Sequence, residues 1–228
     1  MPRPANPTLR DDILAAALRL VEEKGMSGVT MREIAGALGY SATAIYQHYD
    51  SKEALLLALQ LQAGDLLTAE MEAARQEPTL EAQLQAMGYR YLQFGLNNAA
   101  YYRLIFQDSV PGLSLTPEQH TRMRHSWAIM RDTLGAWVEA RGLQGRDVDQ
   151  EANVLWAMAH GLTSLALAGR LPSGNQAEIF ALWNMAAARW ATGVLSVQSS
   201  QLQTSKQKPV RRKKTVAVRR PKRSRGNS

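Results

Sequence analysis

The feature that most constrains the fold is a series of four helical segments in the first third of the chain. In the first segment, apolar residues from Ile13 to Val21 recur at helical spacing and form one stripe. Gly25 and Gly39 are expected to end the first and second segments. The third segment is barely two turns long, and the fourth is long and rich in leucine. This pattern predicts a compact unit of short helices.

Polar residues mark the start of each of these segments. Thr8 is expected to cap the first helix, and Ser41 the third. Thr30 followed by Glu33 has the spacing of a capping box and predicts the start of the second helix. The pair Asp50 and Glu53 suggests a second capping box before the fourth helix.

The second and third segments, with the turn at 39–41 between them, have the layout of a helix-turn-helix. In that motif the latter helix enters the DNA major groove. On the third helix Ile45 and Tyr49 are expected to face inward, and Thr43, Tyr46 and Gln47 outward. Such small polar side chains can reach base edges and phosphate oxygens. On this pattern alone, a helical bundle with a polar surface helix is an equally good interpretation.

The remainder of the chain also has helical periodicity, and no alternating strand pattern of useful length is present. Further helices are expected at about 79–98, 99–107, 117–141, 147–170 and 175–197. Turn-forming residues separate them. The predicted fold class is therefore all-α.

Positive charge is concentrated at the C-terminus. The chain carries 27 Lys and Arg against 20 Asp and Glu, but eleven of the basic residues lie between Lys206 and Arg225, where there is no acidic residue. The rest of the chain is therefore mildly acidic. Because residues 199–228 are polar and lack aromatic side chains, they are expected to form a disordered basic tail. Such a tail is either simply solvated or a source of phosphate contacts without sequence preference.

Several classes of protein are disfavoured by what the sequence lacks. It contains no cysteine, no phosphate-binding glycine loop and no nucleophile elbow. His120 and His125 are five residues apart, off a shared helical face, so no metal site is expected. No cofactor or enzymatic activity is predicted. Without a secretory signal or an apolar run that could span a membrane, the protein is expected to be cytoplasmic, with no membrane partner.

The run GVTMREIAGALGYSATAIYQHYDSKEALL resembles the N-terminal DNA-binding domain of the TetR family of bacterial transcription regulators. The matching elements are T-x-R-E-I-A, Y-x-H-Y and S-K-E-A-L-L. The resemblance implies a helix-turn-helix domain over 1–58, joined by a long fourth helix to a helical ligand-binding and dimerisation domain over 59–198, with the tail at 199–228.

The resemblance also implies which residues approach DNA. Arg32 is a candidate guanine reader, and Tyr49 is expected in the core. Ala44 stands where many relatives have threonine, which removes one possible hydroxyl contact. The complete set of implied DNA-contacting residues is Thr30, Arg32, Ser41, Ala42, Thr43, Tyr46, Gln47, His48 and Lys52.

The segment VLWAMAHGLTSLALAGRL is similar to a subgroup of TetR C-terminal domains marked by a tryptophan and then His-Gly, here Trp156, His160 and Gly161. The resemblance implies a homodimer formed by the last two helices of each subunit. Two-fold symmetry then predicts a roughly palindromic double-stranded operator.

Aromatic and methionine side chains in the C-terminal part are candidates to line a cavity for an apolar or aromatic effector. For each residue alone, ordinary core packing is the more common explanation. The candidate set is Tyr91, Phe94, Tyr102, Phe106, Met123, Trp127, Met130, Trp156 and His160.

Together these features predict a sequence-specific transcriptional regulator, expected to be a repressor that a small molecule releases from its operator. A constitutive nucleoid-type DNA-binding protein that relies on its basic tail is the first alternative. A helical enzyme or ligand carrier is the second, and the lack of catalytic motifs disfavours it.

Overall fold

The computed structural model describes residues 8–106, 115–143, 145–171 and 175–206. Within these ranges every regular element is an α-helix or a 3-10 helix, and there is no strand. The all-α prediction is therefore confirmed. Contacts divide the chain into two units, Met1–Trp190 and Ala191–Ser228. The described part of the second unit is the continuation of one long helix.

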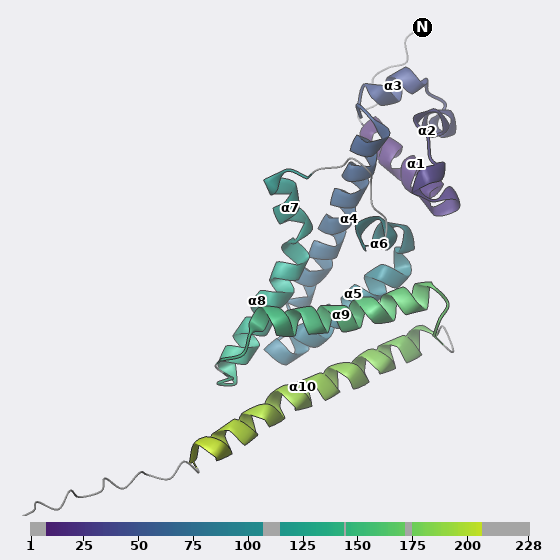
Figure 1. The fold of residues 1–228 in the computed structure, drawn as a ribbon. Helices are drawn as coiled ribbons and strands as arrows, with labels where there is room; N and C mark the ends of the chain where they lie inside the picture. Colours follow the sequence, from purple (N-terminus) through teal and green to yellow (C-terminus); the bar gives the residue numbers. More distant parts are fainter. Residues whose placement is uncertain (1–7, 107–114, 144, 172–174, 207–228) are drawn as a thin grey trace, which may run out of the picture. The chain divides into compact units, whose positions relative to one another are not determined.

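The N-terminal part of the first unit forms a small helical head around the start of a long helix (Figure 1). The head ends at about residue 59. Its elements are α1 (Leu9–Lys24), the 3-10 turn η1 (Met26–Gly28), α2 (Met31–Leu38), α3 (Ala42–Tyr46) and the first two turns of α4 (Lys52–Ala74). A buried core of Ile13, Ile34, Ile45 and Leu55, each fully inaccessible to solvent, holds these helices together.

Helix starts in the head follow local capping chemistry, with two corrections. Thr30 and Glu33 form the predicted capping box, and the Ser41 hydroxyl accepts a hydrogen bond from the Ala44 N–H. Thr8 precedes α1 but makes no capping hydrogen bond with its side chain, because its backbone is already helical (φ −95°, ψ 0°). The predicted cap of α4 at Asp50 is wrong by one residue. The cap is Ser51, whose hydroxyl accepts a hydrogen bond from the Ala54 N–H.

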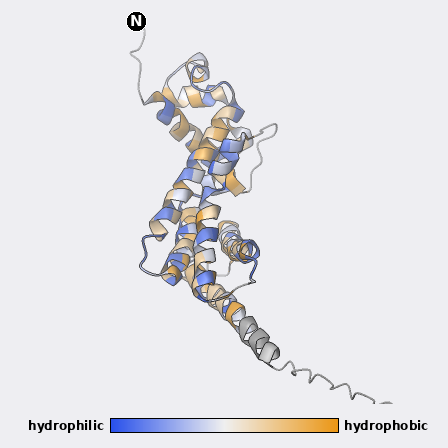
Figure 2. Cartoon of the chain, turned by 90° about the vertical axis from the view of Figure 1, so that its left-hand side faces the viewer, coloured by the Kyte–Doolittle hydropathy of each residue, from blue (hydrophilic) through white to orange (hydrophobic). Residues whose placement is uncertain are grey.

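The C-terminal part of the first unit packs further helices along α4. They are α5 (Leu80–Asn97), α6 (Ala99–Phe106), α7 (Pro117–Met123), α8 (His125–Ala140), α9 (Val148–Leu167) and the first half of α10 (Gln176–Lys206). Apolar and polar residues alternate around these helices, as expected for helices that each bury one side (Figure 2).

The single helix predicted over 117–141 is in fact two helices. They meet at Arg124, although no glycine or proline lies near this residue. The break lets α7 contact α4: the Met123 side chain packs at Gly64, and Arg122 makes a two-pronged ion pair with Asp65. Tertiary contacts with α4 therefore account for a break that local sequence does not specify.

Glycines on α5 allow two close approaches. A Cβ atom at Gly88 would overlap the buried Trp183 ring of α10, and one at Gly95 would overlap the Thr163 side chain of α9. Both positions therefore require glycine in this packing. A T-shaped contact between Tyr89 and Phe180 also joins α5 to α10, with ring centroids 5.2 Å apart.

Helix α10 is longer than predicted. It continues to Lys206 rather than ending near 197, so residues 199–206 are helical although they were expected to be disordered. The remainder of the predicted tail, 207–228, lies outside the described residues. Among the described helices, none is both long enough and apolar enough to cross a membrane.

Candidate functional site

A left-handed glycine forms the turn between α2 and α3. Gly39 has φ 68°, a conformation that glycine adopts without steric cost. The Tyr40 N–H then reaches back to the Ala35 carbonyl at 2.9 Å and closes the end of α2. Ser41 starts α3 directly afterwards. The sequence therefore produces the tight turn between two short helices that defines a helix-turn-helix.

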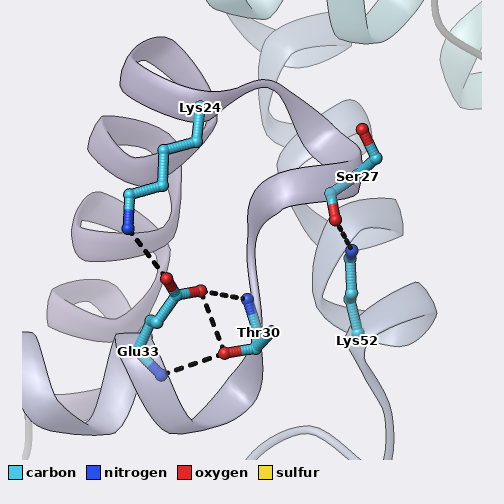
Figure 3. A network of polar contacts seen from close by, with 5 residues as sticks. All are labelled: Lys24, Ser27, Thr30, Glu33 and Lys52. Carbon is cyan, nitrogen blue, oxygen red and sulfur yellow. Dashed lines mark hydrogen bonds and ion pairs between the residues drawn. The ribbon is translucent and has the colours of Figure 1, made fainter.

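Polar contacts connect the start of α2 to the end of α1 (Figure 3). The Glu33 carboxylate accepts from the Thr30 N–H at 3.0 Å and from the Thr30 hydroxyl at 2.9 Å. It also pairs with Lys24 Nζ at 2.8 Å. The hydrogen bond from Lys24 and those from Thr30 lower the pKa of Glu33, so this carboxylate stays ionised at neutral pH. These contacts fix the angle at which α2 leaves α1.

A second polar contact lies beside this network in Figure 3: Lys52 Nζ donates to the Ser27 carbonyl oxygen at 3.5 Å. It joins the first residue of α4 to η1. The lysine is half-buried, and its ammonium group has further donors available.

Helix α3 has one buried side and one exposed side. Ile45 is fully buried and Tyr49, just beyond the helix, is 4% exposed. Tyr46 is 49% exposed, and Thr43 and Gln47 are also exposed. This is the arrangement that the sequence predicted for a helix facing a major groove. α3 itself ends at Tyr46, earlier than expected, and a hydrogen-bonded turn carries the chain to Tyr49.

The structure places all the predicted DNA-contacting residues at or near the surface of the head. Ala42 and Lys52 are half-buried, and the others are exposed: Thr30, Arg32, Ser41, Thr43, Tyr46, Gln47 and His48. Two of the hydroxyl groups also have structural roles, because Thr30 completes the capping box and Ser41 caps α3.

Sequence reasoning missed one residue that supports this surface. Arg10 of α1 donates from Nε to the Tyr49 hydroxyl at 3.3 Å, and its guanidinium carbon lies 5.4 Å from the centre of that ring. Arg10, Tyr49 and Gln62 line a cleft of about 260 Å³ that also reaches the pair formed by Asp65 and Arg122. Only the tertiary fold brings Arg10 to Tyr49, so no local pattern could have found this contact.

A second polar site lies in the C-terminal part, where α5, α6 and α9 meet. The Tyr102 hydroxyl is 2.8 Å from His160 Nδ1 and 3.1 Å from the Ser164 hydroxyl. The Tyr91 hydroxyl is 3.2 Å from the same Nδ1 and accepts from Trp156 Nε1 at 3.3 Å. We call this group the histidine cluster; its members are Tyr91, Tyr102, Phe106, Trp156, His160 and Ser164.

Burial sets the protonation of the histidine cluster. It raises the pKa of Tyr91 and of Tyr102, so both hydroxyl groups keep their protons at neutral pH. Burial also lowers the pKa of His160, so the imidazole is neutral. The cluster is therefore an uncharged hydrogen-bonded network among aromatic rings.

The histidine cluster contains five of the nine predicted ligand-binding residues and adds Ser164, which the sequence did not suggest. The ring contacts join Phe106 to Tyr91, Tyr102, Trp156 and His160. The other predicted residues have different surroundings. Met123 packs at Gly64, Trp127 lies under Arg124, Phe94 is buried in α5, and Met130 is half-buried in α8.

Helix α6 connects the core of the head to the histidine cluster. Tyr102 and Phe106 are four residues apart and belong to the histidine cluster. Leu104, between them, is fully buried and is part of the core of the head. The buried Gln60 side chain of α4 donates to the Leu104 carbonyl oxygen at 2.6 Å. One short helix therefore contacts the head on one side and the histidine cluster on the other.

Comparison with known protein families gives two matches. Residues 13–59 match the model of bacterial regulatory proteins of the tetR family, and residues 84–189 match the model of the tetracyclin repressor-like C-terminal domain. The chain belongs to the TetR family. Members of this family are DNA-binding transcriptional regulators and not enzymes.

Individual TetR-family relatives agree with this assignment. The transcriptional activator FasR of Mycolicibacterium smegmatis is 32% identical over 43% of this chain and 46% of its own length. The class D tetracycline repressor protein of Escherichia coli is 33% identical over 41% of this chain and 38% of its own length. The chain thus spans less than half the length of either relative.

The fold also matches a solved TetR-family structure. The regulator PfmR from Thermus thermophilus superimposes with a TM-score of 0.60, covering 76% of this chain and 96% of that chain, at 23% identity. This likeness supports the all-helical TetR fold.

Among the described residues, no group of three or more histidine and acidic side chains is arranged to hold a metal ion.

Proposed function

We propose that this protein is a homodimeric transcriptional repressor that binds a palindromic operator and is released by a small apolar or aromatic ligand. Residues 1–58 read the DNA, residues 59–198 bind the ligand and form the dimer, and residues 199–228 provide a basic tail. The DNA-binding part of this proposal rests on α3 and the turn after it, which carry Thr43, Tyr46 and Gln47 in exposed positions.

Thr43 and Tyr46 of α3 and Gln47 directly after it suit a major groove because their side chains are exposed, polar and uncharged. Gln47 and Thr43 can hydrogen-bond base edges, while Tyr46 and His48 can reach phosphate oxygens. Arg32, exposed near the start of α2, supplies a guanidinium suited to guanine. Lys52, the first residue of α4, contributes a positive charge to the backbone contacts.

Dimerisation through the last two helices is supported by an exposed apolar face on α9. Val154 and Leu165 are each 46% exposed, and Ala157 and Gly161 lie at helical spacing between them. A Cβ atom at Gly161 would meet nothing within 4 Å among the described residues. A glycine that no described neighbour requires suits close packing against a second subunit. This also favours the subgroup resemblance carried by Trp156, His160 and Gly161.

Control by a ligand is supported by α6. Helix α6 contributes Tyr102 and Phe106 to the histidine cluster and Leu104 to the core of the head. A molecule that rearranged Tyr102 or Phe106 would therefore also displace Leu104. Such a ligand must bind the released form better than the operator-bound form. Relatives include proteins named as an activator and as a repressor. The tetracycline repressor likeness is the basis for proposing repression.

The basic tail keeps one alternative open, a constitutive nucleoid-type protein in which the tail dominates binding. The two functions differ in the ratio of operator affinity to random-DNA affinity. A sequence-specific regulator binds its operator at least about a thousandfold more tightly than random DNA, whereas a packaging protein shows a ratio near one.

The function can be tested with sheared DNA from the organism that encodes the protein. Full-length protein and the double variant Thr43→Ala/Gln47→Ala are incubated with the fragments at physiological salt, and the bound DNA is sequenced. We expect the wild type to enrich a few sites upstream of genes and the variant to lose that enrichment. Uniform recovery by both proteins would contradict the proposal and favour the nucleoid-type alternative.

The ligand is tested by thermal shift. We expect apolar aromatic compounds to raise the melting temperature and, when added to an enriched DNA fragment, to release the protein. Stabilisation by polar compounds alone would overturn the apolar assignment.

A further inference from the structure

The histidine cluster contains a ring nitrogen, His160 Nε2, that has no hydrogen-bond partner among the described residues. His160 lies on α9, with its ring stacked on Tyr102 at 5.5 Å, in an edge contact with Phe106 at 5.3 Å and tilted against Trp156 at 5.7 Å. Its Nδ1 atom has two tyrosine hydroxyl groups as neighbours. Nδ1 either accepts from these hydroxyl groups or donates to one of them, depending on which ring nitrogen carries the proton.

Two proton arrangements satisfy these contacts. The Tyr91 hydroxyl accepts from Trp156 Nε1, because an indole N–H is only a donor, and its own proton can go to His160 Nδ1 at 3.2 Å or to the Tyr102 hydroxyl. The Tyr102 proton can go to Nδ1 at 2.8 Å, or to the His160 carbonyl oxygen or the Ser164 hydroxyl, each 3.1 Å away. When Nδ1 accepts from a tyrosine, the neutral imidazole carries its hydrogen on Nε2.

His160 Nε2 lies away from the partners of Nδ1 and has no hydrogen-bond partner among the described residues. His160 is only half-buried, so Nε2 is accessible. Within the described part of the chain, the imidazole forms no ion pair, and burial alone accounts for its lowered pKa. Its surroundings are the rings of Phe106 and Trp156.

We propose that His160 is the Nε2–H tautomer, that this N–H recognises the effector, and that the effector is a neutral carbonyl compound with an apolar or aromatic frame. A carbonyl oxygen satisfies the unused donor, while the frame packs on Phe106 and Trp156. A carboxylate would enter an apolar site without a positive partner, which is costly. A protonated amine would place a second hydrogen-bond donor against Nε2–H. This inference rests on the proposed ligand control.

The tautomer can be measured without any ligand. In full-length protein labelled with ¹⁵N, two-bond correlations between ring nitrogens and carbon-bound protons identify which nitrogen of each of the four histidines is protonated. The variant His160→Asn identifies the His160 signals by their loss. We expect His160 to be the Nε2–H tautomer. A proton on Nδ1 would overturn the inference.

Recognition can be measured with probes that differ only in the carbonyl group. The bicyclic ketone tetralone, its parent hydrocarbon tetralin and the carboxylate naphthoate are titrated calorimetrically into wild-type protein without DNA. We expect tetralone to bind about tenfold more tightly than tetralin, as for one additional hydrogen bond to a buried donor, and more tightly than naphthoate. Equal affinity for tetralone and tetralin, tighter binding of naphthoate, or no binding of tetralone would overturn the inference.

Two variants of His160 separate the roles of its nitrogens. Asparagine keeps an oxygen near the Nδ1 position to accept from tyrosine but provides no donor at Nε2. Glutamine places an amide N–H near Nε2. We expect His160→Asn to abolish the preference for tetralone over tetralin and His160→Gln to retain part of it. His125→Asn, on exposed His125 of α8, is the matched control and should keep the full preference. A preference that survives in His160→Asn would also overturn the inference.

The proposed function and this inference fail in different ways. If tetralone binds preferentially but does not release bound DNA, the recognition by His160 stands and the proposed ligand control is contradicted. If other ligands release the DNA while tetralone and tetralin bind equally, the control stands and the role of Nε2–H is contradicted.

Discussion

Tyr102 and Leu104 lie two residues apart on α6 and serve different parts of the molecule. The Tyr102 hydroxyl reaches His160 Nδ1 at 2.8 Å, whereas the Leu104 side chain is fully buried in the core of the head. The Leu104 carbonyl oxygen also accepts from Gln60 of α4. A shift of α6 would therefore displace residues of the histidine cluster and of the core of the DNA-reading head together.

Leu104 should contribute to stability as a core residue. We expect Leu104→Ala to lower the free energy of unfolding by about 2–5 kcal/mol, because it leaves a cavity between α6 and the head. Leu66→Ala on α4 is the control, since Leu66 is 43% exposed, and it should change stability by less than about 0.5 kcal/mol. Denaturant unfolding at a fixed protein concentration measures both. Equal effects would show that Leu104 does not join α6 to the head.

The capping box at Thr30 should stabilise α2 independently of any DNA contact. Thr30→Ala removes the hydroxyl that accepts from the Glu33 N–H, and we expect a loss of about 1 kcal/mol in unfolding free energy. Thr30→Ser keeps the hydroxyl and should lose much less. Thermal or denaturant unfolding without DNA compares the two. If serine is as damaging as alanine, the hydroxyl is not the stabilising group.

His160 should make stability depend on pH in a defined window. Its ordinary pKa is 6.5 and burial lowers it in the folded chain, so the unfolded chain binds the proton more tightly. The stability associated with neutral His160 is full above pH 6.5 and is lost as pH falls through the lowered, folded-state pKa. We expect His160→Asn to lack this loss and His125→Asn to retain it. Unfolding measured from about pH 8 to about pH 5 tests this. Parallel curves for wild type and His160→Asn would contradict the expectation.

Arg32 and Lys52 should affect DNA binding in different ways. Arg32→Ala should reduce affinity mainly for the preferred sequence, by about 1–3 kcal/mol, if the guanidinium reads a base. Lys52→Gln should weaken preferred and random duplexes alike and reduce the salt dependence, as for a phosphate contact. Fluorescence anisotropy at several salt concentrations distinguishes them. A uniform loss for Arg32→Ala would assign it to the backbone instead.

The basic tail should add affinity without specificity. Truncation after Lys206 leaves α10 whole and removes ten Lys and Arg. We expect operator and random DNA to be weakened about equally. The slope of log affinity against log salt should fall by about 0.9 for each phosphate that the tail no longer neutralises. An unchanged slope would mean that the tail does not contact DNA.

Sequence reasoning succeeded where structure depends on neighbours along the chain. The Thr30 capping box, the Ser41 cap and the turn at Gly39 follow local rules, and the inward positions of Ile45 and Tyr49 follow helical periodicity. Thr8 shows the limit of these rules, since a suitable residue at the right position makes no cap when its backbone is already helical.

The histidine cluster shows what the sequence could not provide. Tyr91, Tyr102 and His160 come from three helices, which tertiary packing brings together, for example at Gly95 against Thr163 and Tyr102. Composition suggested aromatic residues and methionines as ligand contacts. It could not show which of them lie near His160 and which, like Met123 and Trp127, lie elsewhere. Likewise, the break at Arg124 depends on contacts with α4 and leaves no signal in the local sequence.

Selection of bound sequences from random duplex DNA tests the central claim most directly. It should be done at about physiological salt, because phosphate contacts depend steeply on ionic strength. The full-length protein and the form truncated after Lys206 are compared. A dimer of helix-turn-helix heads predicts that both recover the same palindrome, with half-sites related by two-fold symmetry. Recovery of no motif by either protein would contradict a sequence-specific regulator and point to nonspecific DNA binding.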